Sequence, residues 1–263
     1  MYLFDIHSHI LPGIDDGVTT VDEAIEILKS AYDDGIRHIV LTPHYYARER
    51  SVNRFIDKRK RQFDKLKEEI SRLGIKCPKL YLGAEVNLST DISEIENIEK
   101  LAIEGTNYIL VEMPYSVWQE WMYASLFNLM SMKNLVPIIA HVERYMNAKN
   151  NERILRLSEM DVYFQINATS LLEKAYSGFV TKLICNNFVF FLGSDTHDRE
   201  IRPNRLKEAV LVLEKKVSKK YVEFLMTNAH MMIDNRYIER TEAKYVSKEK
   251  LSFFSKLLNI GSI

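Results

Sequence analysis

Short apolar runs alternate along this chain with longer stretches of helical periodicity, and this alternation restricts the fold more than any other feature. Seven runs of four to seven residues have the length and apolar content of buried β-strands. Strands that alternate with helices pair in parallel through right-handed crossovers. The predicted strands cover residues 3–6, 36–41, 80–86, 108–111, 136–140, 162–166 and 188–192.

Helix signals fill the stretches between these runs. Thr20 and Glu23 have the spacing of a capping box, which predicts a helix that runs to about residue 32. One apolar stripe over residues 56–73 predicts a second helix, which Gly74 closes. Further helices are predicted near residues 117–133, 150–159, 171–186, 204–215 and 218–228.

Seven strand–helix units without a glycine-rich nucleotide-binding fingerprint favour a TIM-like α/β barrel over an open sheet. The 263 residues, of which 46% are hydrophobic, are sufficient for one such barrel with a full core. No repeat, low-complexity segment or Pro/Gly linker divides the chain. We therefore expect a single barrel domain over residues 1–263, with a C-terminal tail from about residue 240.

Charge and cysteine content argue against several classes of function. Thirty-six basic and thirty-six acidic residues cancel, so no net positive field favours nucleic acid or an anionic membrane. Cys77 and Cys185 are too few for a disulfide framework, which fits a reducing compartment. The N-terminus lacks signal-peptide features, and no apolar run approaches the ~18 residues that cross a bilayer. We expect a soluble, cytoplasmic protein without a nucleic-acid partner.

Histidines and carboxylates fall at the C-terminal ends of the predicted strands. Because the strands of a parallel barrel all end at one rim, these side chains are expected to converge there. In a strand, side chains two residues apart face the same side. Both members of the pair His7 and His9, and both members of the pair Asp195 and His197, can therefore point into one cavity. The residues at strand ends are His7, His9, His44, Glu85, Glu112, His141, Asp195 and His197, and Asp16 lies in a nearby turn.

These nine side chains predict a metal centre. Imidazole and carboxylate without thiolate suit manganese, iron(II) or zinc in a catalytic site. Nine ligands exceed the needs of one ion and fit two or three, with a carboxylate such as Glu85 as a bridge. Asp5 and Asp15 have either a turn role or a role behind the ligands. His38 and His230 are interpreted as ordinary structural histidines.

Taken in order, the motifs around these residues resemble the polymerase-and-histidinol-phosphatase (PHP) superfamily. Within it, they are similar to the manganese-dependent protein-tyrosine phosphatases of Gram-positive capsule and exopolysaccharide synthesis. The resemblance extends from residue 2 to about residue 235. The matching stretches are DIHSHILP at residues 5–12, IDDG at 14–17, TPH at 42–44, GAEV at 83–86, VEMP at 111–114, IAHVER at 139–144 and GSDTHD at 193–198.

This resemblance implies a distorted (β/α)7 barrel with a manganese cluster of three ions, for which iron or zinc are alternatives. It also implies hydrolysis of phosphotyrosine on a cognate bacterial tyrosine kinase. By analogy, Arg144 and Arg202 bind phosphate. From the mechanism of ester hydrolysis, we add Asp198 as a candidate proton donor to the leaving group. The ligand sets carried over from the family are His7, His9, Glu85 and Asp195; Glu85, Glu112 and His141; and Asp16, His44 and His197.

A cysteine mechanism does not fit the sequence. Cysteine-based tyrosine phosphatases need an arginine six positions after the cysteine, whereas Gly83 follows Cys77 and Phe191 follows Cys185 at that distance. The alternative activities are a small-molecule phosphoesterase, such as histidinol-phosphate phosphatase, and a PHP-fold binding module without catalysis. The Asp-Asp-Gly turn and the Ala-His-x-Glu-Arg stretch favour the capsule-type phosphatase.

The end of the chain is apolar and partly amphipathic. We expect it to form a last helix that packs on the barrel. The alternative is peripheral contact with a membrane or a membrane-bound kinase. The residues concerned are Leu251, Phe253, Phe254, Leu257, Leu258 and Ile260, together with Lys248, Lys250 and Lys256.

Overall fold

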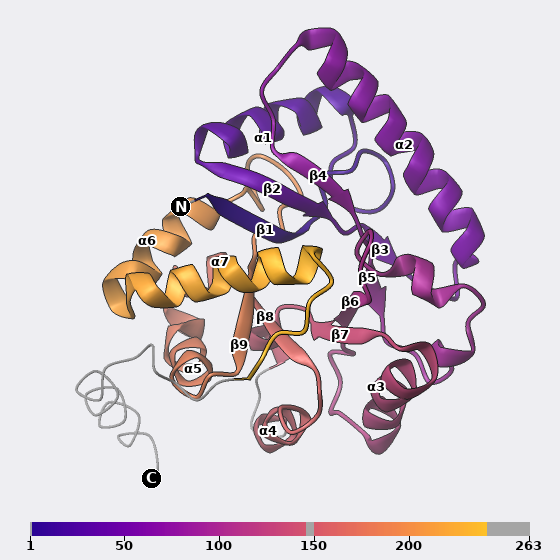
Figure 1. Ribbon diagram of the computed structural model, residues 1–263, viewed down its shortest axis with the longest axis vertical. Coiled ribbons are helices and arrows are strands. Elements are labelled where there is room, and N and C mark those ends of the chain that lie inside the picture. Colours follow the sequence, from indigo (N-terminus) through magenta and orange to yellow (C-terminus); the bar gives the residue numbers. More distant parts are fainter. Residues whose placement is uncertain (1, 146–149, 241–263) are drawn as a thin grey trace.

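The computed structural model describes residues 2–145 and 150–240, in which every strand pairing is parallel (Figure 1). All seven predicted strand positions are strands in the structure. The strands of the described ranges are β1 (Leu3–Ser8), β2 (Ile36–Leu41), β3 (His44–Tyr45), β4 (Lys79–Leu82), β5 (Glu85–Asn87), β6 (Tyr108–Glu112), β7 (Val136–Ile139), β8 (Tyr163–Asn167) and β9 (Val189–Gly193).

The predicted strand at residues 80–86 is interrupted, and a short additional strand, β3, follows β2; the sequence pattern predicted neither feature. The chain leaves the ladder at residues 42–43 between β2 and β3, and at residues 83–84 between β4 and β5. The strands therefore divide into one sheet with the order β1-β2-β4 and another with the order β3-β5-β6-β7-β8-β9. Hydrogen bonds from Gly83 N to Leu41 O (2.9 Å) and from Glu85 N to Pro43 O (3.1 Å) continue the pairing across the gap.

The barrel closes where β1 meets the segment that follows β9. Asp195 N donates to His7 O, and His9 N donates to Thr196 O, each at 2.8 Å. Ser8 and Thr196 also form a parallel bridge. Strands β1, β6, β8 and β9 are buried along their whole length, as expected for strands covered on both faces. The predicted distorted, TIM-like barrel is thus confirmed.

The helices surround this barrel (Figure 1). One half of the predicted capping box is present, since the Thr20 side chain accepts a hydrogen bond from Glu23 N (3.2 Å), whereas the Glu23 carboxylate accepts from Thr19 N (3.4 Å). Gly74 ends α2 in the left-handed conformation, with φ of 61°. The helices of the described ranges are α1 (Val21–Asp33), α2 (Val52–Leu73), α3 (Glu120–Lys133), α4 (Asn151–Leu157), α5 (Lys174–Cys185), α6 (Leu206–Lys216) and α7 (Lys219–Ile233), with short 3-10 turns η1 (Ile92–Glu94), η2 (Ile98–Leu101), η3 (Val142–Tyr145) and η4 (Thr169–Leu171).

Helix α7 covers the N-terminal ends of the strands, so the opposite rim is left for a site. Phe4, at the start of β1, donates its N–H to Met226 Sδ (3.2 Å), and the Tyr221 hydroxyl donates to Val189 O (3.0 Å). His38 and His230 pack around Phe4 at ring-centroid distances of 4.9 and 5.3 Å. Their structural interpretation therefore agrees with their positions.

A buried arginine supports the gap between β4 and β5. The Arg59 guanidinium of α2 donates to the carbonyl oxygens of Gly83 and Lys100. The bond to Gly83 supplies a hydrogen-bond donor for a carbonyl group that lies in the gap between β4 and β5.

Within the described ranges, no helix combines the length and the apolar character needed to span a bilayer. The single-domain boundaries stay a prediction. The apolar C-terminal stretch falls in residues 241–263, which lie outside the described residues.

Candidate metal centre

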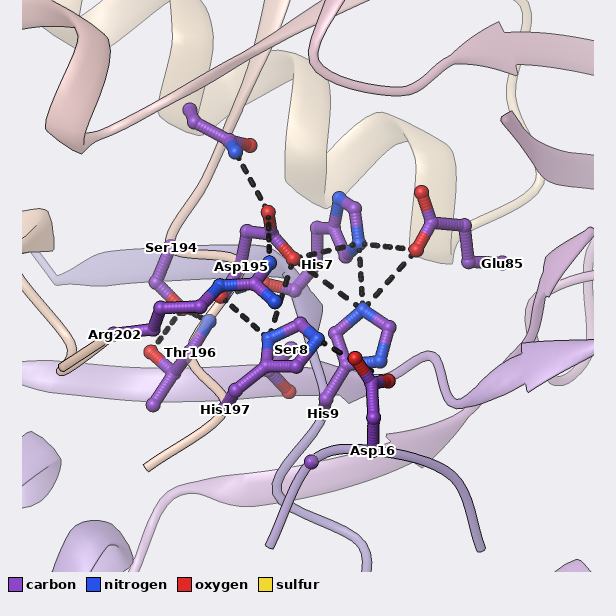
Figure 2. A network of polar contacts seen from close by, with 12 residues as sticks. His7, Ser8, His9, Asp16, Glu85, Ser194, Asp195, Thr196, His197 and Arg202 are labelled. Atoms are coloured by element: carbon purple, nitrogen blue, oxygen red, sulfur yellow. Dashed lines mark hydrogen bonds and ion pairs between the residues drawn. The ribbon is translucent and has the colours of Figure 1, made fainter. Parts of the chain in front are cut away.

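The C-terminal ends of the strands meet at one rim, and the predicted polar side chains gather there. Figure 2 shows several of them converging from segments that are far apart in the sequence. Strands β1, β3, β5 and β6 supply ligand candidates directly, and others follow β1, β7 and β9. The residues brought to this rim are His7, His9, Asp16, His44, Glu85, Glu112, His141, Asp195 and His197.

The innermost group consists of two imidazoles and two carboxylates. His7 Nε2 and His9 Nε2 lie 3.0 Å apart, and each lies 3.1 Å from Glu85 Oε2. Asp195 Oδ1 lies 3.5 Å from His7 Nε2 and 3.4 Å from His9 Nε2. All four side chains are buried. Four donor atoms therefore surround one small space.

A second group lies toward solvent. Asp16 Oδ1 is 3.7 Å from His44 Nε2 and 3.6 Å from His197 Nε2. The His9 and His197 rings stack at a centroid distance of 3.9 Å, which joins this group to the inner one. The Asp16 side chain is 66% exposed, unlike the other candidates, so it lies at the mouth of the site.

Glu85 stands between the groups in a bridging position. One of its oxygens, Oε1, lies 2.7 Å from His141 Nε2, whereas Oε2 faces His7, His9 and His44. Glu112 completes this side, with Oε1 4.0 Å from His141 Nε2. The structure thus brings together each of the three ligand sets that the family resemblance implies.

Three imidazoles are oriented by hydrogen bonds to acceptors other than the ligand side chains. His7 donates its Nδ1–H to Gln165 Oε1 (3.1 Å), and His9 donates its own to Asp15 Oδ2 (2.7 Å). His197 donates Nδ1–H to the carbonyl oxygen two residues before it (2.9 Å). In each ring Nδ1 therefore carries a proton, and Nε2 faces inward as the nitrogen available to a metal ion, as in metal-binding histidines.

Several inward-facing atoms have no hydrogen-bond partner among the described residues. The buried atoms His44 Nδ1 and His197 Nε2 belong to this group, and both lie near carboxylates. Unpartnered buried nitrogens beside carboxylate oxygens are what a bound cation would satisfy. The nitrogen and oxygen donors, without thiolate, fit manganese, iron or zinc.

Two candidate ligands have a strained backbone. His141 and Asp195 have φ of 32° and 56°, in the left-handed region that residues with a side chain rarely adopt. Such strain is typical of functional sites, where the surrounding structure holds a residue in one orientation.

The electrostatics of the cluster favour charged carboxylates at Glu85 and Asp195 and divide the imidazoles into two groups. Against the effect of burial, neighbouring carboxylates raise the pKa values of His7 and His9, whereas burial lowers those of His44, His141 and His197. Burial opposes ionisation of Glu85, yet His7 and His141 hold the pKa of that carboxyl well below its usual range. Burial also opposes ionisation of Asp195, and His7 again lowers its pKa strongly. Burial, followed by the charge of His9, lowers the pKa of His197 to about 3. The ionised carboxylates and the neutral His197 are in the protonation states that metal binding requires, whereas a cation that binds His7 and His9 must displace protons from them.

Arg144 and Arg202 meet at one oxygen of Asp195. Arg144 Nη2 lies 2.6 Å and Arg202 Nη2 lies 2.8 Å from Asp195 Oδ2, to which Asn167 Nδ2 also donates (2.8 Å). The other oxygen, Oδ1, faces the imidazoles. The two guanidiniums are therefore fixed beside the cluster, and both remain partly exposed.

Asp5 and Asp15, whose roles the sequence left open, lie behind the ligands. Asp15 accepts a hydrogen bond from His44 N (2.7 Å) in addition to the one from His9. Asp5 accepts from Ser194 N (2.8 Å) and from the side chain of Asn204 (2.9 Å). Both carboxylates thus hold the backbone that carries the ligands.

Sequence reasoning missed Gln165 and Asn167 on β8. Gln165 Oε1 accepts from His7 Nδ1 and from His141 N (2.9 Å), and Gln165 Nε2 donates to Asn167 Oδ1 (2.9 Å). The two residues form an i, i+2 pair at a strand end, which is the signal that revealed the histidine pair on β1. The same periodicity could have found them.

Asp198, the candidate proton donor, organises the loop that carries Arg202. Its carboxylate accepts hydrogen bonds from the backbone N–H groups of Glu200, Ile201 and Arg202. Although desolvation opposes ionisation, these N–H groups lower the pKa of Asp198. These hydrogen bonds favour the ionised carboxylate, so they argue against a role of Asp198 as proton donor, which stays a prediction.

Comparisons with known proteins agree with this geometry. The sequence profile of the family described as capsular polysaccharide synthesis, CpsB/CapC, matches residues 3–234. The tyrosine-protein phosphatase YwqE of Bacillus subtilis is 30% identical over 261 residues, which cover 96% of this chain and 100% of YwqE. The tyrosine-protein phosphatase CpsB of Streptococcus agalactiae serotype III (strain NEM316) is 28% identical over 249 residues, with 90% of this chain and 100% of CpsB covered.

Solved structures show the same fold. A structure described as YwqE from Bacillus subtilis and CpsB from Streptococcus pneumoniae, unique metal-dependent tyrosine phosphatases, superimposes with a TM-score of 0.81 at 28% identity. It covers 94% of this chain and all of the matched chain. An inactive dihydroorotase-like domain from Chaetomium thermophilum matches with a TM-score of 0.52 at 11% identity, which is evidence of the fold alone.

The fold and the site thus define an α/β barrel with a histidine and carboxylate cluster of the kind that holds divalent metal ions. The chain belongs to the CpsB/CapC family of capsular polysaccharide synthesis.

Proposed function

We propose that this chain is a metal-dependent protein-tyrosine phosphatase. Its substrate would be phosphotyrosine on a cognate bacterial tyrosine kinase, and the activity would regulate capsular or exopolysaccharide synthesis. The observation that carries the proposal is that the two carboxylate oxygens of Asp195 face different groups. Oδ1 faces the imidazoles of the cluster, and Oδ2 contacts Arg144 and Arg202. Relatives named tyrosine-protein phosphatases support the substrate class.

We assign the nine rim side chains as ligands of two or three divalent ions. Manganese is the proposed ion, with iron and zinc as the alternatives that suit the same donors. Elemental analysis of the purified protein distinguishes the three. The proposed ligands are His7, His9, Asp16, His44, Glu85, Glu112, His141, Asp195 and His197.

The proposed mechanism uses the chain's own residues to bind and orient the phosphate. Clustered divalent ions, when bound, lower the pKa of a water molecule and neutralise charge on phosphoryl oxygens. Arg144 and Arg202 each present a planar fork that can bind two phosphate oxygens. A phenolate has a conjugate-acid pKa of about 10, so this leaving group needs little help from an acid. The engagement of Asp198 in its loop is compatible with that chemistry.

A comparison of substrates tests the proposal. The full chain, loaded with manganese, is expected to hydrolyse a phosphotyrosyl peptide with a much higher kcat/KM than histidinol phosphate. Asp195→Asn should abolish turnover of both, which identifies activity that comes from this site. A strong preference for histidinol phosphate in the unmodified protein would contradict the proposal and favour a small-molecule phosphoesterase.

We also propose that the protein works in the cytoplasm, next to a membrane-bound kinase. Peripheral membrane contact would occur through that partner or through the C-terminal tail, whose residues 241–263 lie outside the described ranges. Deletion after about residue 245, followed by measurement of membrane recovery and solubility, separates these routes. Unchanged membrane recovery of the truncated chain would exclude the tail.

A further inference from the structure

A cavity of about 440 Å³ opens beside the metal centre. Its walls come from the segment after β3, the segment after β5, and the start of α3 with the loop before it. Its volume lies in the range of pockets that bind small ligands or single side chains. Among its lining residues are Tyr46, Arg48, Asn87, Thr90, Pro114 and Trp121.

This cavity shares walls with the metal centre. The ring of Tyr46 stacks on His44 at a centroid distance of 5.3 Å and an interplanar angle of 30°. On the next strand, Asn87 Nδ2 donates to Glu112 Oε2 (3.3 Å). If a substrate phosphate is bound at the ions, the part of the substrate next to that phosphate would therefore lie near this cavity.

An exposed tyrosine next to a lining residue of the cavity also contacts the metal centre. Tyr115, which follows the lining residue Pro114, is 59% exposed and stacks on His141 at 6.4 Å with an interplanar angle of 17°. Two aromatic rings thus stack on different histidines of the cluster. A flat substrate ring that approaches the ions would therefore meet aromatic side chains beside them.

The chemistry of the lining selects an apolar occupant. Trp121, Pro114 and Leu88 supply apolar surface, and Trp121 is only partly buried although it is large. Arg48 and Glu49 are adjacent and of opposite charge, so they do not favour a strongly charged ligand. The cavity therefore suits an aromatic or aliphatic side chain with solvent at its edge.

We propose that this cavity is a peptide subsite, which takes an apolar side chain two residues away from the phosphotyrosine. The inference rests on the proposed phosphatase function. An extended peptide advances about 3.3 Å per residue, and alternate side chains point to the same side. The side chain two positions away therefore lies about 7 Å along the peptide and faces the protein together with the phosphotyrosine. Trp121 would be the main contact.

The test compares kcat/KM for paired phosphotyrosyl peptides with leucine or aspartate two residues before or after the phosphotyrosine. Phenyl phosphate, which has no flanking residue, serves as the reference substrate. The manganese-loaded full chain should prefer the leucine peptide of at least one pair by about tenfold, as expected for a side chain in an apolar pocket. Trp121→Ala should reduce this preference to near unity.

Two further variants keep the result interpretable. Thr90→Trp fills the cavity from its exposed edge without removing Trp121, and it should also abolish the preference. Phe127→Ala, an exposed aromatic residue on the same helix outside this cavity, should retain it. If the unmodified protein hydrolyses the phosphotyrosyl peptides and phenyl phosphate but does not prefer leucine to aspartate, the subsite alone would be overturned. No turnover of either would overturn the proposed function and the subsite with it.

Discussion

The orientation of His7 depends on a single neutral side chain. Gln165 Oε1 accepts the Nδ1–H of this ring and also the backbone N–H of His141, so one amide positions two proposed ligands from different strands. A carbonyl oxygen can only accept, and it therefore fixes the tautomer of His7 with Nε2 toward the cluster.

Replacement of this amide should weaken metal binding. Gln165→Met, similar in length but without an acceptor oxygen, is expected to lower manganese affinity roughly ten- to hundredfold. Gln165→Glu keeps an acceptor oxygen for His7, so its manganese affinity should fall by less. Calorimetric titration of the stripped proteins with manganese measures both. Equal affinities for the unmodified protein and Gln165→Met would show that the amide does not orient the ring.

Glu143 is a buried carboxyl group with a different character. Its Oε1 accepts from Asn167 N (3.1 Å), whereas Oε2 has no hydrogen-bond partner among the described residues. Burial raises the pKa of Glu143 from 4.5 to about 8. The folded protein therefore holds a proton that the unfolded chain releases above pH 4.5, so this group lowers stability as the pH rises from about 4.5 to 8.

Glu143→Gln removes that titration while it keeps an acceptor for Asn167. The stability of this variant relative to the unmodified protein should rise by on the order of 3 kcal/mol between pH 5 and pH 8. Urea unfolding of both proteins, in the presence of a chelator, gives the difference at each pH. A difference that stays constant with pH would contradict a raised pKa at this position.

At the scale of elements, the site depends on how closely β9 approaches β1. A Cβ atom at Gly193 would lie 2.6 Å from His7 Cβ and 3.0 Å from Gln165 Nε2. Real atoms do not come so close, so only glycine allows the two strands to bring their ligands together.

Gly193→Ala is therefore expected to destabilise the protein by about 2 to 3 kcal/mol and to abolish phosphatase activity. Gly178→Ala is the matched control, because a Cβ atom there meets nothing within 4 Å on the exposed face of α5. That change should be neutral or should stabilise the helix by up to about 1 kcal/mol. Thermal unfolding and phosphatase assays of both variants measure these effects. Similar losses of stability and activity in Gly193→Ala and Gly178→Ala would refute the packing argument.

The elements themselves were largely predictable, since apolar runs and helix caps are local signals. The gap at residues 83–84 was not, because Gly83 and Ala84 fit an apolar strand pattern. Tertiary contacts interrupt the strand there. The chain pairs with β2 before the gap and with β3 after it, and Arg59 of α2 donates a hydrogen bond to the carbonyl oxygen of Gly83. Local periodicity carries no information about either contact.

At the scale of the whole molecule, topology made the site predictable. Once the strands were taken as parallel, the C-terminal ends that carry His7 and Asp195 had to share one rim. The positions of Gln165 and Asn167 were harder to interpret, because neutral amides occur in many structural roles. The left-handed backbone at His141 and Asp195 has no local sequence signal, since it follows from the packing around the barrel.

The central claim is that a metal cluster at this rim hydrolyses phosphotyrosine, and metal removal tests it most directly. The experiment measures metal content by elemental analysis, together with turnover of a phosphotyrosyl peptide by the full chain. We expect two or three ions per chain, loss of turnover on chelation and recovery with manganese. Alkylation of Cys77 and Cys185, whose pKa values burial raises, should leave turnover intact. Full turnover by a chain shown to contain no metal would contradict the account.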